Sequence, residues 1–509
     1  MTDATENPLL KRLGGISRKA INKTRSLLSG GARDDQSQAS TSQLTTNPLV
    51  VPSGDHPVTP KTLSRAAVKV LTKLDEAGYA AYLVGGGVRD ALVGLRPKDF
   101  DIATDASPED VRALFRNSRI IGRRFRLVHV VFGREIIEVA TFRAAHDKGA
   151  GGEVGASGRI VRDNVFGSIE EDAMRRDFSV NALYYNIADH SVVDYVGGLV
   201  DIDAGVFRLI GDPLTRCEED PVRVLRAVRL AAKLEFSIQA DTLAAMRKTA
   251  VELQHTPPAR LFEEVLKLFQ GGYALRSFAA VVDNDLLQYL FPLLDERLKA
   301  GDEPLRHMLD EALENTDRRV ASGKPITPAY LLAFMLWPDV EHDTNQEVAR
   351  GTSLHDALYT AGESVLSTQV KVTSIPRRFS GPMKEIWQMQ PRLEQWRGAR
   401  ALKLIAERRF RAAYDFLCLR ASQNPELEPL AAWWTKVQTL TEDDRVVAAN
   451  DKPLVHCWGQ GAAADAPEGD DSATADRQGS AKKAPAKRRR RRRRRKPGGD
   501  KSNRPGPAS

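Results

Sequence analysis

The strongest constraint on the fold lies between residues 80 and 104, where two short apolar stretches enclose a glycine turn and two aspartates. Ala80–Val84 and Phe100–Ala103 each have the length of a buried strand, and the three glycines 85–87 interrupt the chain after the first. Residues 88–93 then continue with helical spacing. A strand that passes through a glycine turn into a helix and is followed by a second strand predicts a small α/β unit.

The neighbouring sequence supplies further elements of this unit. Apolar residues recur at helical spacing from Leu63 to Leu74, and Gly78 suits the end of that helix. Ser107 followed by Pro108 is typical of a helix start, and that helix is predicted to run to about residue 115. Two strands, 126–132 and 135–142, are predicted around a turn at 133–134. We therefore expect a mixed or antiparallel sheet with helices beside it.

Beyond this unit the periodicity becomes that of helices. Apolar i, i+3, i+4 spacing appears in 222–234 and 258–269, and helical character continues to about residue 440. We predict an α+β protein with an α+β head at 59–200, a mostly α-helical neck at 201–275 and a helical body at 276–440. The polar segments 1–58 and 441–509 are predicted to be disordered tails, and the glycine-rich stretch 148–158 to be a loop.

The net charge of +8 is concentrated at one end of the chain. Residues 482–509 hold 14 of the 75 basic residues and one of the 67 acidic ones, so the other 481 residues are net acidic by five charges. The eight consecutive arginines 488–495 repel one another but can bind phosphate groups or anionic proteins. We expect this basic tail to bind RNA or protein partners in RNA turnover, and a solubilising role is the alternative.

Nothing in the sequence indicates a membrane-spanning or secreted protein. No apolar run approaches the roughly 18–20 residues of a membrane span, and no apolar core precedes a cleavage site near the N-terminus. The three cysteines are widely separated. A cytoplasmic location is the expectation. Residues 9–28 are basic with scattered Leu and Ile, so they are either a weak amphipathic helix at a membrane or partner surface, or a solubilising segment.

Two aspartates stand at the start of the second predicted strand. Asp99 and Asp101 flank Phe100, and because side chains alternate along a strand, both carboxylates point to one face and Phe100 to the other. Two like charges this close are tolerable when divalent cations lie between them, and hard oxygen ligands suit Mg²⁺. The pair therefore predicts a magnesium site.

A glycine turn precedes the aspartates, with twelve residues between Gly86 and Asp99. At Gly85 and Gly86 the absence of side chains lets backbone N–H groups approach a phosphate. Arg89, in the helix that follows, can add a charge-assisted contact. A glycine turn and a metal-binding pair on consecutive strands together predict a site for a nucleoside triphosphate with its metal.

These motifs together resemble a known family. Gly85-Gly86 and the later DFD triplet (99–101) are similar to the nucleotidyltransferase superfamily with a DNA polymerase β-like palm, and the longer strings GGGVRD (85–90) and KDFD (98–101) resemble its class II branch. That branch contains the tRNA CCA-adding enzymes and the bacterial poly(A) polymerases, which extend RNA 3′ ends without a nucleic-acid template. The resemblance implies a polymerase-β-like head and adds Asp90 to the triphosphate-binding residues.

Three further motifs occur in the order that the family has. RRDFSVNA (175–182) resembles its RRDFT-N-A segment, in which the Asp at the position of Asp177 belongs with the active-site carboxylates. DYVGG (194–198) resembles the hinge-like neck motif. EDPVR (219–223) resembles the motif that contacts the incoming base, here through Asp220 and Arg223. Arg226 and Arg229 continue one basic face, so they are candidates for RNA or phosphate contacts. We accordingly expect the neck (201–275) to bind the nucleotide base and RNA, and the body (276–440) to bind RNA.

The implied reaction is attack of an RNA 3′-hydroxyl on the α-phosphorus of a triphosphate. One Mg²⁺ ion lowers the pKa of the hydroxyl and a second neutralises the leaving pyrophosphate, with Asp99 and Asp101 holding both ions. The identity of a third carboxylate stays open. The resemblance offers Asp177, whereas the strand pattern offers Glu138, because it lies on the strand predicted to neighbour the aspartates.

Asp220 and Arg223 have a physical logic for base choice. Adenine and cytosine both present an amino donor beside a ring-nitrogen acceptor, which a carboxylate and a guanidinium on one helix face complement. Guanine and uracil present the reverse order and leave buried groups unpaired. The pair therefore predicts selection of A or C and does not decide between them.

The segment IIGRRFRLVHV (120–130) favours poly(A) addition, because it resembles the signature of bacterial poly(A) polymerases. Its basic cluster, Arg123, Arg124 and Arg126, fits a contact to RNA or triphosphate. We predict a polynucleotide adenylyltransferase that uses ATP and Mg²⁺ to extend RNA 3′ ends in RNA processing and turnover. The alternatives are a CCA-adding enzyme and a non-catalytic RNA-binding protein on the same scaffold.

Overall fold

The computed structural model describes residues 48–459 except 123–125, 145–152, 155–159 and 163–165. Within these ranges no helix is long and apolar enough to cross a membrane. The predictions for residues 9–28, most of the 148–158 loop and the arginine run 488–495 lie outside the described residues.

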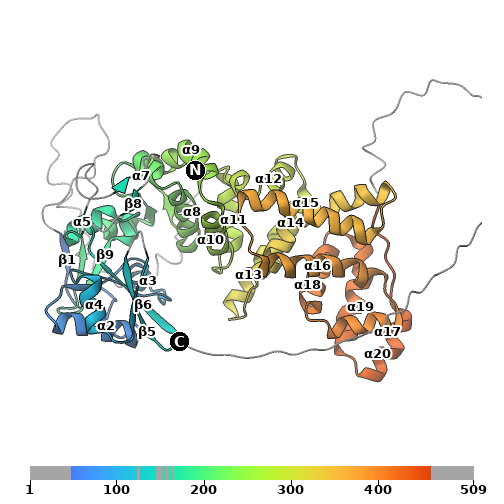
Figure 1. Cartoon of the computed structure of the whole chain (residues 1–509), viewed down its shortest axis with the longest axis horizontal. Helices are drawn as coiled ribbons and strands as arrows, with labels where there is room; N and C mark the ends of the chain where they lie inside the picture. The colour runs from blue at the N-terminus through green and yellow to red at the C-terminus, as the bar shows by residue number, and fades with distance from the viewer. Residues whose placement is uncertain (1–47, 123–125, 145–152, 155–159, 163–165, 460–509) are drawn as a thin grey trace, which may run out of the picture. The chain divides into compact units, whose positions relative to one another are not determined.

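The predicted mixed sheet is confirmed, and it has eight strands in the order β1-β10-β9-β2-β3-β6-β5-β4. Figure 1 labels β1, β9, β6 and β5 of this sheet. β3 and β6 are parallel, and the other neighbouring strands are antiparallel. The strands span Leu49–Val51 (β1), Ala81–Val84 (β2), Asp101–Thr104 (β3), Ser118–Ile121 (β4), Leu127–Phe132 (β5), Glu135–Thr141 (β6), Leu183–Asn186 (β9) and Val192–Asp194 (β10). Smaller pairs are formed by β7 (Glu153–Val154) with β8 (Ile160–Arg162), and by β11 (Val206–Phe207) with β12 (Ser237–Ile238).

Three of the eight strands lie outside the predicted α/β unit. β9 and β10 lie within the predicted head, 59–200, but beyond its last predicted strand, where we expected helical periodicity, and β1 lies in the segment 1–58 that we predicted to be disordered. β1 pairs with β10, and Val51 and Val58 are buried in the core. The predicted boundary at residue 58 is therefore wrong for 49–58, because one short strand gains its stability from a partner more than 140 residues away.

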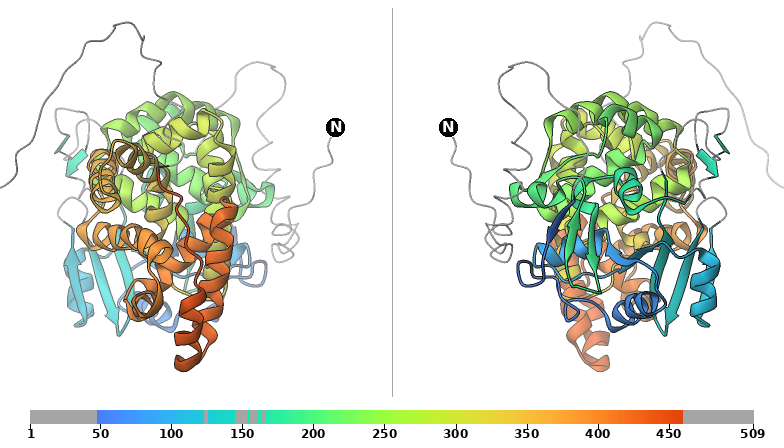
Figure 2. Two further views of the ribbon diagram at one scale, coloured as in Figure 1. Left: turned by 90° about the vertical axis from the view of Figure 1, so that its right-hand side faces the viewer. Right: turned by 90° about the vertical axis from the view of Figure 1, so that its left-hand side faces the viewer.

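Two helices cover one face of the sheet. α2 (Arg65–Glu76) begins at Ser64, whose side chain accepts the N–H of Ala67, and α4 (Pro108–Leu114) begins with a reciprocal capping box between Ser107 and Asp110. Both helices contact β6, and α4 lies beside the hairpin β5–β6 (Figure 2). They cover the main hydrophobic core. The opposite face carries a smaller apolar cluster that includes Val84 and Tyr184.

The rest of the described chain is mostly helical, as predicted, and two helices have the predicted bounds, 222–234 and 258–269. The remaining segments are α3 (Gly86–Leu92), α5 (Ile169–Arg175), the 3₁₀ turn η2 (Ser179–Asn181), α6 (Gly198–Ala204), α7 (Pro213–Glu219), α8 (Val222–Leu234), α9 (Ala240–Thr249), α10 (Pro258–Phe269), α11 (Ala274–Asp283), α12 (Pro292–Lys299), α13 (Glu303–Ala321), α14 (Pro328–Ala349), α15 (Leu354–Val372), α16 (Arg377–Gln395), α17 (Gly398–Leu402), α18 (Phe410–Ala421), α19 (Glu428–Thr439) and α20 (Glu442–Ala448).

Residues 441–459 have a defined structure, so the prediction of disorder from 441 is wrong for 441–459. After α20, residues 449–459 form a C-terminal strap on the body. Lys452 Nζ donates to the carbonyl oxygen of Glu394 over 2.8 Å, and Trp458 Nε1 donates to the Glu394 carboxylate over 2.5 Å. The backbone N–H of Gly459 donates to Oδ1 of Asn345 over 2.9 Å. These contacts to distant helices are invisible in the polar composition of the segment.

Candidate active site

The glycine turn and the carboxylates meet at one end of the central strand pair. Val84, the last residue of β2, lies opposite Asp101, the first residue of β3. Gly85 follows with a φ of 71°, a left-handed value that favours glycine. A Cβ atom at Gly85 would lie 3.9 Å from Oδ2 of Asp101 and 3.6 Å from Nη1 of Arg176. The turn and the Asp101 carboxylate are therefore immediate neighbours.

A further carboxylate faces the same edge of the sheet. In the parallel pairing of β3 with β6, Asp101 is in register with Glu138. Glu138 is opposite His129 of β5, and His129 Nε2 lies 3.1 Å from Oε1 of Glu138. Phe100, by contrast, is buried in the main core. Asp101 and Glu138 thus share the face opposite to Phe100, as the alternation of side chains predicts.

The surroundings of Asp101 resist its ionisation. The carboxyl group is exposed at the edge of the sheet, yet the surrounding protein removes part of its hydration. That loss, together with the negative charges of Glu138 and Asp99, raises the pKa of Asp101 to about 6, and the guanidinium of Arg176 opposes the shift. Asp99 and Glu138 are therefore close enough to act on Asp101 electrostatically, and Arg176 offsets their negative charge only in part.

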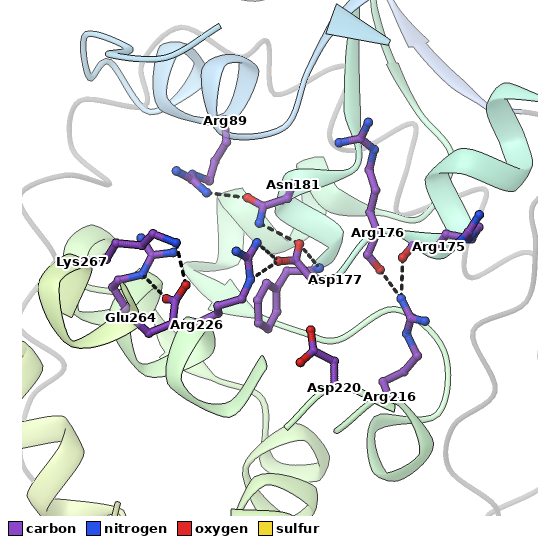
Figure 3. A network of polar contacts seen from close by, with 12 residues as sticks. Arg89, Arg175, Arg176, Asp177, Asn181, Arg216, Asp220, Arg226, Glu264 and Lys267 are labelled. Atoms are coloured by element: carbon purple, nitrogen blue, oxygen red, sulfur yellow. Dashed lines mark hydrogen bonds and ion pairs between the residues drawn. The ribbon is translucent and has the colours of Figure 1, made fainter. Parts of the chain in front are cut away.

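Asp177 lies in a different setting, between the head and α8 (Figure 3). Its Oδ2 accepts a hydrogen bond from Arg226 Nε over 3.0 Å, and its Oδ1 accepts from Asn181 Nδ2 over 3.0 Å. Burial opposes ionisation, but the Arg226 guanidinium and the Asn181 amide outweigh it and hold the pKa of Asp177 well below its ordinary value. The charge of Asp177 is thus already neutralised within the protein.

Arg89 and Asp90 are buried and bound to other side chains of the protein. Their predicted triphosphate contacts stay a prediction. Arg89 Nη2 lies 2.6 Å from Oδ1 of Asp90, and Arg89 Nη1 donates to Asn181 Oδ1 over 2.5 Å. Lys233 of α8 lies 2.6 Å from the other oxygen of Asp90. Since both side chains are less than a tenth exposed, they fasten the turn to η2 and to α8.

Asp220 and Arg223 do not share a helix, contrary to our expectation. Asp220 lies between α7 and α8 with extended backbone, and its Oδ1 accepts the N–H of Val222 over 3.2 Å at the start of α8. Its Oδ2 lies 2.7 Å from Nη2 of Arg260, a residue of α10. Arg223 Nη1 lies 3.0 Å from Oε2 of Glu219. Both predicted base-recognition residues therefore have partners from the protein itself.

The arginines predicted to contact RNA or phosphate are mostly paired with carboxylates. Arg226 pairs with Asp177, and Arg126 pairs with Glu109. Arg229 lies 3.4 Å from the buried Glu264 and is itself largely buried. Arg126, Arg226 and Arg229 thus have carboxylate partners 17, 49 and 35 positions away, and their contacts to RNA or phosphate stay a prediction. Arg123 and Arg124 lie outside the described residues.

The neck motif forms a tight corner. Asp194 accepts backbone N–H groups from Val196, Gly197, Gly198 and Leu199 over 2.9–3.1 Å, which caps the start of α6. A Cβ atom on Gly198 would lie 2.2 Å from the carbonyl oxygen of Ser179, so this position admits glycine alone. The motif thereby fixes β10 and α6 to the RRDFSVNA segment.

Sequence reasoning missed three residues that hold the site together: Asn181, Lys233 and Arg260. Asn181 bridges Arg89 and Asp177, Lys233 holds Asp90, and Arg260 holds Asp220. A signal was available for two of them, because Asn181 belongs to the RRDFSVNA string and Arg260 to the PPARLFEE segment (257–264). Lys233 had no such signal.

The donor set of Asp99, Asp101 and Glu138 fits Mg²⁺ in chemistry. All their ligand atoms are carboxylate oxygens, which this ion prefers. Loss of hydration and the negative charges of Glu138 and Asp99 raise the pKa of Asp101, and a cation would compensate that charge. Within the described ranges no three His, Cys, Asp or Glu side chains form a preformed metal cluster. The structure therefore supplies carboxylate ligands and negative charge at the sheet edge, and these three carboxylates do not form a complete metal-binding cluster.

Comparison with known proteins identifies matching segments along most of the chain. Residues 81–208 match the Poly A polymerase head domain, residues 235–298 the probable RNA and SrmB-binding site of polymerase A, and residues 350–496 the polymerase A arginine-rich C-terminus. The chain is 47% identical over 406 residues to poly(A) polymerase I of Escherichia coli O6:H1, which covers 78% of this chain and 87% of that protein.

More distant similarity extends to enzymes that process tRNA. The chain is 31% identical over 316 residues to the CCA-adding enzyme of Bacillus pumilus, covering 61% of this chain and 77% of that one. A solved structure of a tRNA-processing enzyme in its apo form I has a TM-score of 0.50 and 22% identity, covering 75% of this chain and 94% of that chain, and it shares the fold. The three matched segments and the 47% identity over most of both chains show that the chain belongs to the poly(A) polymerase family of nucleotidyltransferases.

Proposed function

We propose that the protein adds AMP from ATP to RNA 3′ ends without a template, in RNA processing and turnover in the cytoplasm. The observation that carries this proposal is the meeting of the Gly85 turn with the carboxylates of Asp101 and Glu138 at one sheet edge. The names of the most similar relatives support adenylate addition over CCA addition, since poly(A) polymerase I matches at 47% identity and a CCA-adding enzyme at 31%.

The reaction joins the RNA O3′ atom to the α-phosphorus of ATP and releases pyrophosphate. Asp99, Asp101 and Glu138 would hold Mg²⁺, which when bound lowers the pKa of the 3′-hydroxyl and neutralises charge on the triphosphate; we propose two ions. The positive φ of Gly85 turns the backbone so that the triphosphate can approach without a side chain in the way. Arg89 and Asp90 keep that turn in place through their buried contacts.

We propose Glu138, rather than Asp177, as the third metal-binding carboxylate. The register of β3 and β6 and the charge effect on Asp101 support Glu138, while Asp177 is engaged by Arg226 and Asn181. Glu138→Gln is expected to raise the Mg²⁺ concentration for half-maximal AMP transfer at least about tenfold. Asp177→Asn is expected to leave that concentration unchanged, and the opposite pattern would make Asp177 the ligand.

Base recognition remains assigned to Asp220 and Arg223 in this proposal. A carboxylate has about four acceptor sites and a guanidinium five N–H donors. Two donors engage Asp220, and Arg223 has two partners, Glu219 and the carbonyl oxygen of Arg216. Both side chains therefore keep capacity for an adenine amino group and ring nitrogen. Arg223→Ala is expected to reduce the preference for ATP over GTP by at least about tenfold.

The decisive experiment offers each nucleoside triphosphate separately with Mg²⁺ to an unstructured RNA and to a tRNA that lacks its CCA end. Long extension with ATP alone is the expected result. Addition of CMP to the tRNA, stopping after CCA, would establish the CCA-adding alternative. The Asp99→Ala/Asp101→Ala double variant is the control, because RNA-related function that survives it intact would favour a non-catalytic RNA-binding protein.

We also propose that the basic tail contributes RNA affinity rather than chemistry. Removal of residues 482–509 takes away net charge of +13, so RNA affinity should fall at moderate salt while AMP transfer at low salt is retained. Complete loss of transfer at low salt would contradict this division. Pull-down with the isolated tail peptide would test its predicted protein partners in RNA turnover.

A further inference from the structure

The helical body contains a groove that the proposed reaction does not use. It has a volume of about 780 Å³ and is lined by parts of α13, α14, α16 and α18 and by the loop between α13 and α14. This size is typical of ligand sites. All its lining residues lie between Glu311 and Leu419, so none belongs to the sheet that carries the carboxylates. We refer to it as the body groove.

The body groove is strongly basic. Seven of its lining residues are lysine or arginine and two are acidic. Arg411 is paired with Asp415 in the groove, and Arg409 with Glu385. Lys324, Arg378 and Arg408 are exposed, and no acidic side chain of the described chain forms an ion pair with them. Their charges are therefore available to an anionic ligand.

Aromatic rings lie among these charges. Tyr330 and Phe379 line the groove and are partly exposed. The guanidinium carbon of Arg378 lies 4.8 Å from the centroid of the Phe379 ring, and that of Arg411 lies 5.2 Å from the buried Tyr414 ring. Flat guanidinium and aromatic surfaces stack with bases, and cations pair with phosphates, so the combination suits an unpaired nucleic-acid strand more than a plain anion.

The segments of the chain outside the described residues do not complement this groove. Residues 1–47 contain seven basic and four acidic residues, and residues 460–509 contain fifteen basic and six acidic ones. Both segments carry net positive charge, and the groove repels them. Charge complementarity therefore calls for a separate polyanion.

We propose that the body groove binds single-stranded RNA, a stretch of the substrate upstream of its 3′ end. Phosphates would pair with Lys324, Arg378 and Arg408, and a base would stack against Phe379 or Tyr330. The choice of RNA among polyanions rests on the proposed function, whereas the binding chemistry rests on the groove itself. Its position on the body, outside the head, makes it a second contact for RNA in addition to the reaction centre.

The test removes the three available charges. The variant Lys324→Gln/Arg378→Gln/Arg408→Gln is compared with Arg397→Gln/Lys403→Gln/Lys436→Gln, which removes three exposed cations of the same body that do not line the groove. Dissociation constants for a fluorescent 20-nucleotide oligo(A) are measured from 50 to 300 mM salt, without ATP or Mg²⁺. Thermal melting of both variants checks that they are folded.

The groove variant is expected to bind roughly 10- to 50-fold more weakly at 0.15 M salt, and its log–log salt slope should be smaller by about 2, since each contact to a single strand contributes about 0.7. The matched control variant is expected to change much less in both the dissociation constant and the salt slope. Equal losses in the two triple variants would overturn the proposal, because the groove would then act only through general charge.

A second variant tests the stacking. Phe379→Leu retains an apolar side chain against Phe262, which packs 5.9 Å from Phe379 between ring centroids, and it should weaken oligo(A) binding about fivefold or more without changing the salt slope. A 20-residue poly-Glu peptide is the comparison ligand. If the peptide binds as tightly as oligo(A) and Phe379→Leu changes neither, the groove is a site for an acidic protein and the RNA proposal is wrong.

The binding assay and the reaction fail separately. Absence of AMP transfer by the full chain would contradict the proposed function and leave the oligo(A) result standing. Conversely, the groove variant should retain the AMP transfer rate at low salt with saturating RNA, because none of its residues lies in the head, and it should show a raised KM for RNA at moderate salt.

Discussion

Asp101 in the head and Asp177 between the head and α8 are carboxylates with opposite surroundings. Loss of hydration, together with the negative neighbours Glu138 and Asp99, raises the pKa of Asp101 to about 6. Asp177 has Arg226 and Asn181, and its pKa is held well below the ordinary value. Asp101 lies among negative charges that a bound cation would neutralise. Asp177 is already neutralised by an ion pair that joins the head to α8.

The largest expected difference is in the reaction rate. Asp101→Asn should lower AMP transfer by about a thousandfold or more, because several kcal/mol of metal-dependent charge stabilisation would be lost. Its melting temperature should be unchanged or slightly higher, since one of several like charges is gone. Single-turnover incorporation of labelled ATP measures the rate, and a rate loss below tenfold would break the comparison.

Asp177→Asn should act first on stability. It leaves the Arg226 guanidinium without its carboxylate partner, and we expect the free energy of unfolding to fall by about 2 kcal/mol, less than for a fully buried pair because Arg226 is one-third exposed. Urea denaturation measures this change. Adding Arg226→Met in the same chain should recover part of the loss, and a double variant no more stable than Asp177→Asn alone would show that the ion pair is not the cause.

The two carboxylates should also give stability opposite dependences on pH. Because the pKa of Asp101 is raised, its contribution to the free energy of unfolding is present below its ordinary pKa of 3.8 and is lost as the pH rises through about 6. Because the pKa of Asp177 is lowered, its contribution to the free energy of unfolding is present above 3.8 and is lost as the pH falls below that value.

Melting temperatures from pH 3 to 8 test both directions. Relative to the parent protein, Asp101→Asn should gain stability between pH 4 and 6.5, and the deficit of Asp177→Asn should shrink below pH 4. If the melting temperatures of the two variants changed with pH in parallel, the two carboxylates would not differ in their electrostatic surroundings.

The smallest expected effect is that of Mg²⁺ on the unfolding of the nucleotide-free protein. Binding to ionised carboxylates should raise the melting temperature by a few degrees at pH 7.5 and by less at pH 5, where Asp101 is largely protonated. Addition of EDTA should reverse the gain. The shift should disappear in Asp101→Asn and persist in Asp177→Asn, and persistence in both would place the ion elsewhere.

Local patterns predicted the elements that depend on local chemistry. α8 and α10 have strong apolar periodicity, and their predicted and observed bounds agree. The start of α4 follows from the Ser107 capping box, and the turn at Gly85 from its need for a positive φ. These features are set within a few residues of one another, so one sequence is sufficient to find them.

The partners of the charged side chains could not be predicted in the same way. Asp220 and Arg260 are 40 positions apart, and Asp177 and Arg226 are 49 apart. Their pairing depends on how α8 and α10 pack beside the head. The motif residues could therefore be located, but the partners of Arg89, Arg226 and Arg229 could not, and the phosphate contacts of these arginines stay a prediction.

The position of Glu138 beside Asp101 could be predicted only in part. The alternating pattern of β6 placed it on a strand near the aspartates, but its register with Asp101 depends on a parallel pairing formed across α4 and the β4–β5 hairpin. β1 depends on distant pairing still more strongly, because a run of only three apolar residues between Pro48 and Pro52 becomes a strand by pairing with β10.

The C-terminal strap sets a bound on local concentration. Gly459 is held to Asn345, and 29 peptide steps separate Gly459 from Arg488, the first of the eight arginines. At no more than about 3.6 Å per step, the arginine run begins within roughly 100 Å of that anchor in any conformation. An RNA bound to that run, as we propose, would be confined to a sphere in which one molecule corresponds to a concentration on the order of 0.4 mM. The strap would then make rebinding of a released RNA by the same protein molecule a matter of geometry, independent of the RNA concentration in solution.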